Sequence, residues 1–251
     1  MKLAIDAGNT SVFCAFYKKE EIVETLRFKT TDNLYERLKE LNFKPKEVII
    51  SSVALNINNE LRNACLEVLE CEPDFVSYFS NHGLDIKIEN AEMMGSDLIA
   101  AACGGVSLYK NKNLIIFDLG TTTTTSVITK NKEFVGGNIM PGLMTSLKSL
   151  SSNCVLLQDV EFDENKINLI GNKTSNCMIS GAFHAQLGAM THIKNQIKKE
   201  FFNGDAVVIA TGGYAKLFEK YGIFDYIHET LVTDGIIKMQ SEQKEKVKET
   251  V

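Results

Sequence analysis

The amino-acid sequence contains an internal repeat that restricts the possible folds more than any other feature. Its two copies are Lys2-Leu-Ala-Ile-Asp6-Ala-Gly8-Asn-Thr10 and Leu114-Ile-Ile-Phe-Asp118-Leu-Gly120-Thr-Thr122, with the aspartates 112 residues apart. A second β-type run, a lysine-rich turn and a third run follow each copy, which predicts two three-stranded meanders. The offset is far too long for a solenoid repeat. The sequence therefore predicts two duplicated halves, residues 1–112 and 113–251.

Helical spacing and β-branched runs alternate after each meander. This order predicts an α/β fold with a mixed β-sheet flanked by helices in each half. The expected helices cover residues 33–41, 56–69, 96–109, 141–150 and 175–202. The expected strands that follow the meanders cover residues 47–53, 74–78 and 206–210.

Both copies of the repeat end in a turn with the composition of a phosphate site. A strand that ends in Asp-x-Gly-x-Thr brings together a carboxylate, a hydroxyl and a glycine that lets the backbone approach an anion. The carboxylate suits a magnesium ion or its waters. One such turn is also an ordinary tight turn. Two copies on equivalent strands predict a polyphosphate held by Asp6 to Thr10 and Asp118 to Thr122.

Two further glycine motifs lie in the second half. Val207 to Gly213 is an apolar strand that ends in a glycine pair, where the backbone can lie flat against a nucleotide. A tight strand-to-helix turn explains this motif equally well in isolation. Its position late in the second half favours the nucleotide. Gly136 to Gly142, which includes Pro141, predicts a hairpin exit and a helix start at the wall of the site.

Asp97 is a candidate catalytic residue on its own sequence context. It follows Gly95 and Ser96 and precedes the apolar run Leu98 to Cys103, so it lies at an expected helix N-terminus. There the helix dipole favours a carboxylate. A helix cap formed by Ser96 or Asp97 accounts for the same pattern. A carboxylate base in phosphoryl transfer mainly orients the nucleophile, so an ordinary pKa suffices.

Composition argues against several classes of partner and location. The formal net charge is −5 and the basic residues are scattered, so the electrostatic footprint of a nucleic-acid-binding protein is missing. No stretch reaches the roughly 18 apolar residues of a membrane span, and residues 1–16 lack a signal-peptide core. The six cysteines show no C-x-x-C pair, which predicts reduced thiols in a cytoplasmic protein. His184 and His192 are eight residues apart, which does not form a metal pair on a helix.

In order along the chain, five motifs resemble those of type III pantothenate kinase. They are Asp6 to Thr10, Gly95 to Asp97, Asp118 to Thr123, Gly136 to Gly142 and Thr211 to Gly213. The resemblance implies duplicated ribonuclease H-like domains of the actin and acetate-kinase type, a homodimer, and ATP-dependent phosphorylation of pantothenate, the first step of coenzyme A biosynthesis. Regulatory proteins called Bvg accessory factors share this pattern, and fold similarity alone does not separate the two.

The resemblance also implies roles for individual residues. The ATP site would comprise Asp6, Ala7, Gly8, Asn9, Thr10, Ser11, Val12, Phe13, Thr121, Thr122, Gly212 and Gly213. The acceptor site would comprise Gly95, Ser96, Asp97, Leu98, Ile88 and Thr174, with Asp97 as the base that receives the substrate hydroxyl proton. Asp118 would hold a monovalent cation, K⁺ or NH₄⁺, and Asp6 would face the Mg²⁺ of ATP. The cation suits a chain without arginine after residue 62, because phosphate charge must be offset.

The acceptor motif departs from the family pattern. The family reads Gly-Ala-Asp-Arg where this chain reads Gly95-Ser96-Asp97-Leu98. The family also has a substrate-contacting tyrosine at the position that Ile88 occupies in this chain. Loss of the arginine removes charge-assisted bonds worth about 1.5 to 3 kcal/mol each, unless Lys87 compensates. Three outcomes stay open: a pantothenate kinase, a kinase of another small alcohol, or a nucleotide-binding regulator. The presence of Asp97 and Thr174 favours the first.

Overall fold

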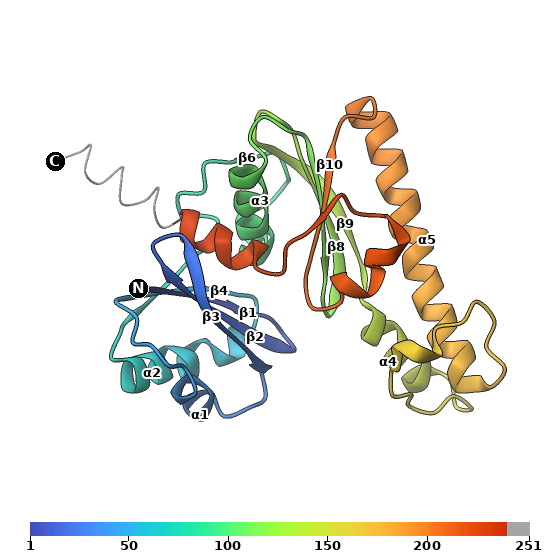
Figure 1. The fold of residues 1–251 in the computed structure, drawn as a ribbon, viewed down its shortest axis with the longest axis horizontal. Coiled ribbons are helices and arrows are strands. Elements are labelled where there is room, and N and C mark those ends of the chain that lie inside the picture. Colours follow the sequence, from blue (N-terminus) through green and yellow to red (C-terminus); the bar gives the residue numbers. More distant parts are fainter. Residues whose placement is uncertain (240–251) are drawn as a thin grey trace. The chain divides into compact units, whose positions relative to one another are not determined.

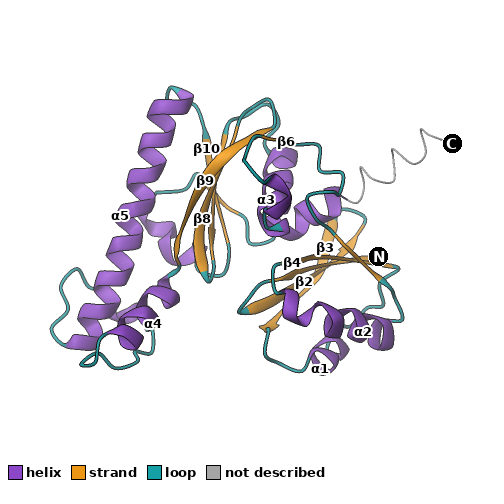
Figure 2. Cartoon of the chain, turned by 180° about the vertical axis from the view of Figure 1, so that it is seen from behind, coloured by secondary structure: helices purple, strands orange, loops and turns teal. Residues whose placement is uncertain are grey.

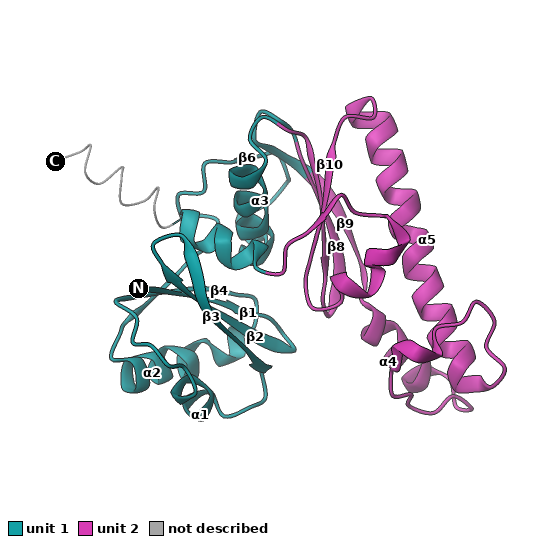
Figure 3. Ribbon diagram, in the orientation of Figure 1, with its two compact units in different colours: residues 1–111, 129–135, 230–251 teal, residues 112–128, 136–229 magenta. Residues whose placement is uncertain are grey.

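The computed structural model describes residues 1–239 (Figure 1). The described chain forms two compact units, one of residues 1–111, 129–135 and 230–239, the other of residues 112–128 and 136–229 (Figure 3). The division into sequence domains at residue 112 stays a prediction. No helix among the described residues has both the length and the apolar character needed to cross a membrane.

The first unit is built on a five-stranded sheet of order β3-β2-β1-β4-β5. Its strands are β1 (Lys2–Ala7), β2 (Ser11–Lys18), β3 (Glu21–Lys29), β4 (Glu47–Ser52) and β5 (Pro73–Phe75). β1 pairs antiparallel with β2 and parallel with β4, and β2 pairs antiparallel with β3. This confirms the first predicted meander. The strand expected over residues 74–78 is the shorter β5.

Helices cover both faces of this sheet (Figures 1 and 2). α1 (Leu34–Lys39) and α2 (Asn58–Leu69) pack over one face, where alternate side chains of β1 and β2, such as Ile5 and Cys14, form an apolar core. α3 (Ser96–Leu108) and the helical residues 231–239 lie on the other face. Since side chains alternate along a strand, Asp6 points to this second face. The remaining short elements of the unit are η1 (Leu55–Ile57), η2 (Ala91–Met93) and β6 (Asp85–Ile86).

The helical segment 231–239 is fixed to the first unit by close backbone contacts and buried hydrogen bonds. A Cβ atom at Gly235 would lie 1.8 Å from the carbonyl oxygen of Ala100, so only glycine allows this approach to α3. The buried hydroxyl of Tyr17 on β2 donates to the carboxylate of Asp234 at 2.7 Å, and its oxygen lies 2.9 Å from the hydroxyl oxygen of Thr233. The segment therefore packs on the sheet face that carries Asp6.

The second sheet repeats the topology of the first. Its order is β11-β10-β7-β8-β9-β6, with β7 (Leu114–Leu119), β8 (Thr122–Ile128), β9 (Glu133–Pro141), β10 (Val207–Thr211) and β11 (Tyr226–Ile227). β7 pairs antiparallel with β8 and parallel with β10, as β1 does with β2 and β4. The strand order β9-β8-β7-β10-β11 thus matches β3-β2-β1-β4-β5. The duplication predicted from the repeat is present in the fold.

Two helices form most of the remaining core of the second unit. α4 (Leu143–Asn153) and the long α5 (Thr174–Phe202) contribute buried residues to it, and η3 (Glu164–Lys166) and η4 (Ala215–Tyr221) are short 3-10 segments. The apolar face of α5 that includes Phe183 and Met190 is buried in this core. The helix start expected within residues 136–142 is confirmed, because Gly142 is the N-cap residue of α4, and β9 continues through the glycines to Pro141.

Candidate functional site

Four residues that are in register form a row across the first sheet, near the ends of β1 and β4. Asp6 on β1 pairs with Phe13 on β2, and Phe13 pairs with Arg27 on β3. On its other side, Asp6 is matched with Ser51 on β4. Directly paired residues point to the same face of a sheet. The side chains of this row, which we call the Asp6 row, therefore share one face.

The first turn of α3 lies at one end of the Asp6 row. The hydroxyl oxygen of Ser96 is 2.8 Å from that of Ser51, and both serines are buried. Asp97 follows directly, and its Oδ1 accepts the backbone N–H of Leu98 at 2.8 Å. The structure thus brings the predicted phosphate-site residue Asp6 and the predicted base Asp97 to the same edge of one sheet.

Gly95 provides the space that the Asp97 carboxylate occupies. A Cβ atom at residue 95 would lie 2.4 Å from Oδ1 of Asp97 and 3.3 Å from Cγ1 of Val53. Gly95 is also the N-cap residue of α3, and no side chain caps the helix there. The cap expected from Ser96 or Asp97 is therefore not formed, because the Ser96 hydroxyl bonds to Ser51 instead.

The environment of Asp97 favours its protonated form. Burial raises the pKa of its carboxyl above the ordinary value, and hydrogen bonds from the backbone N–H groups of Leu98 and Asp97 itself act in the opposite direction. The residue is half-buried, so it stays accessible from solvent. A carboxylate with a raised pKa is a stronger base than an ordinary aspartate.

Thr30 holds the turn after β1, although no sequence motif marks it. The N–H of Thr30 donates to the carbonyl oxygen of Thr10 at 3.1 Å, and the hydroxyl of Thr30 donates to the carbonyl oxygen of Gly8 at 2.8 Å. The N–H of Gly8 donates to the carbonyl of Ser11 at 3.0 Å. Carbonyl oxygens repel anions, and here three of them are engaged by donors of the protein itself.

The other residues expected in the phosphate loop divide between the core and the surface. Ala7 and Val12 are buried in the core beneath α1 and α2, so only their backbone is available to a ligand. Asn9 and Thr10 are exposed at the tip of the turn. A ligand would therefore meet Asn9, Thr10 and the Asp6 row.

The turn after β7 is held in a similar way. The N–H of Gly120 donates to the carbonyl of Thr122 at 2.9 Å. The carbonyl of Thr121 accepts the N–H of Gly142 at 3.0 Å and the hydroxyl of Thr145 at 2.5 Å. A Cβ atom at Gly142 would lie 2.2 Å from the carbonyl oxygen of Gly120, so glycine is required where α4 begins.

Gly212 brings the backbone after β10 onto Asp118. Its φ is +88°, and a Cβ atom there would lie 2.4 Å from Oδ1 of Asp118 and 2.6 Å from the nitrogen of Leu119. The N–H of Tyr214 donates to the carbonyl of Leu119 at 3.1 Å. The two predicted site residues Asp118 and Gly212 are thus neighbours. At Gly213 a Cβ atom would meet no atom within 4 Å.

Gln186, on α5, supports the turn after β7. This role was not predicted from the sequence. The side-chain nitrogen of Gln186 donates to the buried Thr123 hydroxyl at 2.7 Å and to the carbonyl of Pro141 at 3.3 Å. One sequence signal could have identified it: Gln186 places an amide side chain in the otherwise apolar face of α5 that contains Phe183 and Met190. A polar side chain in such a face needs a buried partner.

The predicted acceptor residues occur at three places. Leu98 is half-buried in the first turn of α3, and Ile88 is half-buried shortly after β6. Thr174 is exposed as the first residue of α5. Lys87, considered above as a replacement for the missing arginine, forms a 2.6 Å ion pair with Asp85.

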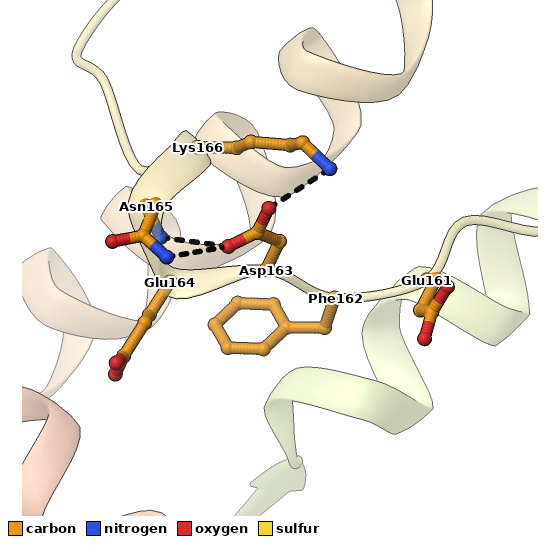
Figure 4. Close-up of a pocket in the computed structure, with 6 residues that line it drawn as sticks. All are labelled: Glu161, Phe162, Asp163, Glu164, Asn165 and Lys166. Atoms are coloured by element: carbon orange, nitrogen blue, oxygen red, sulfur yellow. Dashed lines mark hydrogen bonds and ion pairs between the residues drawn. The ribbon is translucent and has the colours of Figure 1, made fainter.

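Metal-binding clusters and hollows away from the predicted site are two further kinds of candidate site. Within residues 1–239, no group of three His, Cys, Asp or Glu side chains could hold a metal ion. A hollow of about 550 Å³ is lined by residues 161–166 (Figure 4). There Asp163 pairs with Lys166 at 2.9 Å and accepts hydrogen bonds from Asn165. The hollow contains none of the predicted site residues.

Known proteins resemble this chain in sequence and in fold. The family model for type III pantothenate kinase matches residues 2–196. The type III pantothenate kinase of Legionella pneumophila (strain Corby) is 34% identical over 250 residues, with 94% of this chain and 96% of the relative covered. That of Elusimicrobium minutum (strain Pei191) is 35% identical over 260 residues, with 98% and 100% covered.

Solved structures share the fold at low sequence identity. A protein from Campylobacter jejuni described as a Baf family transcriptional activator has a TM-score of 0.62 at 19% identity, with 97% of this chain and 99% of that chain covered. The activator of 2-hydroxyisocaproyl-CoA dehydratase from Clostridium difficile, solved with ADPNP, has a TM-score of 0.50 at 12% identity and covers 97% of each chain. Together with the repeated strand order, these similarities confirm the expected pair of ribonuclease H-like domains.

Proposed function

This chain belongs to the type III pantothenate kinase family, and we propose that it transfers the γ-phosphoryl group of ATP to pantothenate with Asp97 as the base. The observation that carries the assignment of the base is the buried contact of Ser96 with Ser51, which holds Asp97 beside the Asp6 row. Phosphoryl transfer depends mainly on positioning and on electrostatic stabilisation. Held there by α3, Asp97 can orient a hydroxyl at the edge that carries the phosphate turn.

The Asp6 to Thr10 turn of the first unit would bind phosphate oxygens of the nucleotide. Mg²⁺ is usually held by one or two carboxylates together with substrate phosphates and waters. Asp6 fits this donor set without a wider acidic cluster. Asp118, which lies against the backbone of Gly212, would hold the monovalent cation. Mg²⁺ supplies neutralisation of charge on the phosphates.

In the proposed reaction, the pantothenate hydroxyl attacks the γ-phosphorus. A new O–P bond forms, the P–O bond to ADP breaks, and the hydroxyl proton moves to Asp97. The raised pKa of Asp97 favours this proton transfer. The N–H groups of the first turn of α3 hold the carboxylate in place while it accepts the proton.

The acceptor would be recognised without the arginine of the family motif. Thr174 begins the 29-residue helix α5, whose N-terminus favours a negative group such as the pantothenate carboxylate. In the first unit, Leu98 and Ile88 are the proposed contacts for an apolar part of the acceptor. A kinase of another small alcohol is the second candidate, because two contacts at this site are aliphatic.

A homodimer and a cytoplasmic location are further parts of the proposal. Val155, Leu156, Leu169 and Ile170 lie between α4 and α5 and are 76% to 101% exposed. A second copy of the chain would cover such apolar side chains. All six cysteines are free thiols, which suits a reducing compartment. Light scattering of the wild type and of Leu156→Asp tests the dimer.

ADP release with a panel of small alcohols tests the activity. We expect pantothenate to stimulate turnover in the presence of Mg²⁺ and K⁺ or NH₄⁺, and Asp97→Asn to abolish most of it. Leu98→Arg, which restores the family motif, should lower the KM for pantothenate. The exposed Asp74 on β5 supplies a matched control, Asp74→Asn. Absence of pantothenate-stimulated turnover over a range of ATP and salt concentrations would reject the assignment.

A further inference from the structure

Arg27 differs from the other two arginines of the chain in its partners. Arg37 forms ion pairs with Asp32 at 2.8 Å and with Glu40 at 2.7 Å, and Arg62 is paired with Glu72. In the described part of the chain, Arg27 forms no ion pair with a carboxylate. Its guanidinium charge is therefore available to an anionic ligand.

The side chain of Arg27 is held at the edge of the phosphate turn. Its guanidinium carbon lies 4.4 Å from the centre of the Phe13 ring. One of its nitrogens donates to the hydroxyl of Ser11 at 3.4 Å. Phe13 is the register partner of both Arg27 and Asp6. Arg27 thus stands in the Asp6 row, on the face that carries the proposed phosphate site.

This arrangement suits the recognition of phosphate. A guanidinium that lies over an aromatic ring can still donate through N–H groups that point outward in its own plane, and it carries five donors that match phosphate oxygens in pairs. The only hydrogen bond of Arg27 among the described residues is the long one to Ser11. Arg27 is exposed at the edge strand β3, so the remaining donors face solvent.

We propose that Arg27 binds a phosphate group of the nucleotide and is a further ligand-contacting residue of the kinase. The inference rests on the proposed function, because it takes the Asp6 to Thr10 turn as the place where the phosphates bind. The Phe13 ring would serve as the platform that restrains the guanidinium, because Phe13 lies in register with Arg27 on the same face of the sheet. The ligand class is a nucleoside polyphosphate bound with Mg²⁺.

Titration calorimetry with Mg-ATP tests the inference on the full chain. Arg27→Met keeps an apolar stem over Phe13 and removes the charge. Arg62 supplies the matched control Arg62→Gln, since Arg62 also lies over an aromatic ring, that of Phe75, but on the helix α2 that covers the opposite face. We expect Arg27→Met to weaken ATP binding about ten- to hundredfold. Arg62→Gln should stay within twofold of the wild type.

The outcomes separate this inference from the proposed function. Wild-type protein that binds ATP and phosphorylates pantothenate, with Arg27→Met unchanged in Kd, overturns the role of Arg27 alone. An equal loss in Arg62→Gln also overturns it, because net charge would then explain the effect. If the wild type binds no nucleotide, both proposals fail. If Arg27→Met does not fold, Arg27→Gln is measured in its place and the same limits apply.

Discussion

The hydroxyl groups of Ser51 and Ser96 lie 2.8 Å apart in a buried contact that joins β4 to the first turn of α3. Ser51 is the register partner of Asp6, and Ser96 immediately precedes Asp97. The same hydrogen bond therefore connects the neighbours of two carboxylates: Asp6 pairs with Ser51 across the strands, and Asp97 follows Ser96 in the chain. The position of α3 relative to the phosphate turn depends on this pair.

Removal of either serine hydroxyl should reduce both stability and activity. Ser51→Ala leaves a buried hydroxyl without its main partner, which costs about 1 to 3 kcal/mol of unfolding free energy. The double variant Ser51→Ala/Ser96→Ala should cost less than the sum of the single variants, since the two serines are coupled. Urea unfolding and kcat measure the cycle. Ser180→Ala, at a buried serine of the second unit, should lose stability and retain kcat. Additive effects of the two serine variants would contradict the coupling.

Gly95→Ala should impair catalysis more than folding. The added methyl group would overlap Oδ1 of Asp97, and the carboxylate can rotate away at small cost in stability. We expect a drop in kcat of about tenfold or more, because a displaced base loses its alignment. Gly181→Ala is the control, since a Cβ atom there would meet nothing within 4 Å. A Gly95→Ala enzyme with wild-type kcat would show that the position of Asp97 does not matter.

Asp97 should make activity and stability respond oppositely to pH. Its pKa is raised by burial in the folded protein, so the folded state binds more protons than the unfolded state between the two pKa values. Stability therefore falls as pH rises from the ordinary pKa of about 3.9 through the folded value. Activity rises over the same interval, because the base must be ionised, and the acid limb of kcat/KM should lie above pH 3.9.

The variant Asp97→Asn tests both halves of this expectation. Asparagine can still accept the N–H of Leu98, and it carries no buried charge. The variant should unfold at a higher temperature than the wild type at neutral pH and lose about 10²- to 10⁴-fold in kcat. Asp74→Asn should change neither quantity by much. A lower melting temperature for Asp97→Asn would indicate that the charged carboxylate stabilises the fold.

Tyr17→Phe should loosen the helical segment 231–239 from the first unit. The buried Tyr17 hydroxyl bonds to Thr233 and Asp234, and Asp234 also accepts the hydroxyl of Thr230. Loss of this hydroxyl leaves buried polar atoms short of a partner, which costs about 1 to 3 kcal/mol. Hydrogen exchange of residues 231–239 and urea unfolding measure the effect. Tyr35→Phe, on α1, should be nearly neutral, and an equal loss there would contradict the proposed anchoring.

Local pattern was sufficient to predict the repeated strands and the Asp-x-Gly turn at the end of each first strand. Alternation along β1 places Ile5 in the core and Asp6 on the opposite face, and a pattern of period two carries that information without any tertiary contact. Helical spacing of the apolar residues likewise predicted that α3 and α5 are helices. Local pattern also located the start of α4 near Gly142, but it did not show that β9 continues through the glycines to Pro141.

The partners that shape the site were beyond the reach of local pattern. Ser51 and Ser96 are 45 residues apart, and Gln186 and Thr123 are 63 apart. No periodicity relates such positions, because their contacts arise only when a helix packs on a strand. The same holds for Thr30 at the first turn and for the approach of Gly235 to Ala100.

The sequence by itself determined the duplicated fold and the two Asp-x-Gly turns, and it marked Asp97 as a candidate site residue, because these depend on local residue order. Only the tertiary structure decided that Gly95 leaves room for the Asp97 carboxylate, which hydroxyl holds α3, and that Arg27 lies beside the first turn without a carboxylate partner among the described residues. Those features depend on side chains that meet across strands and helices, where packing and burial rather than neighbouring residues select the partner.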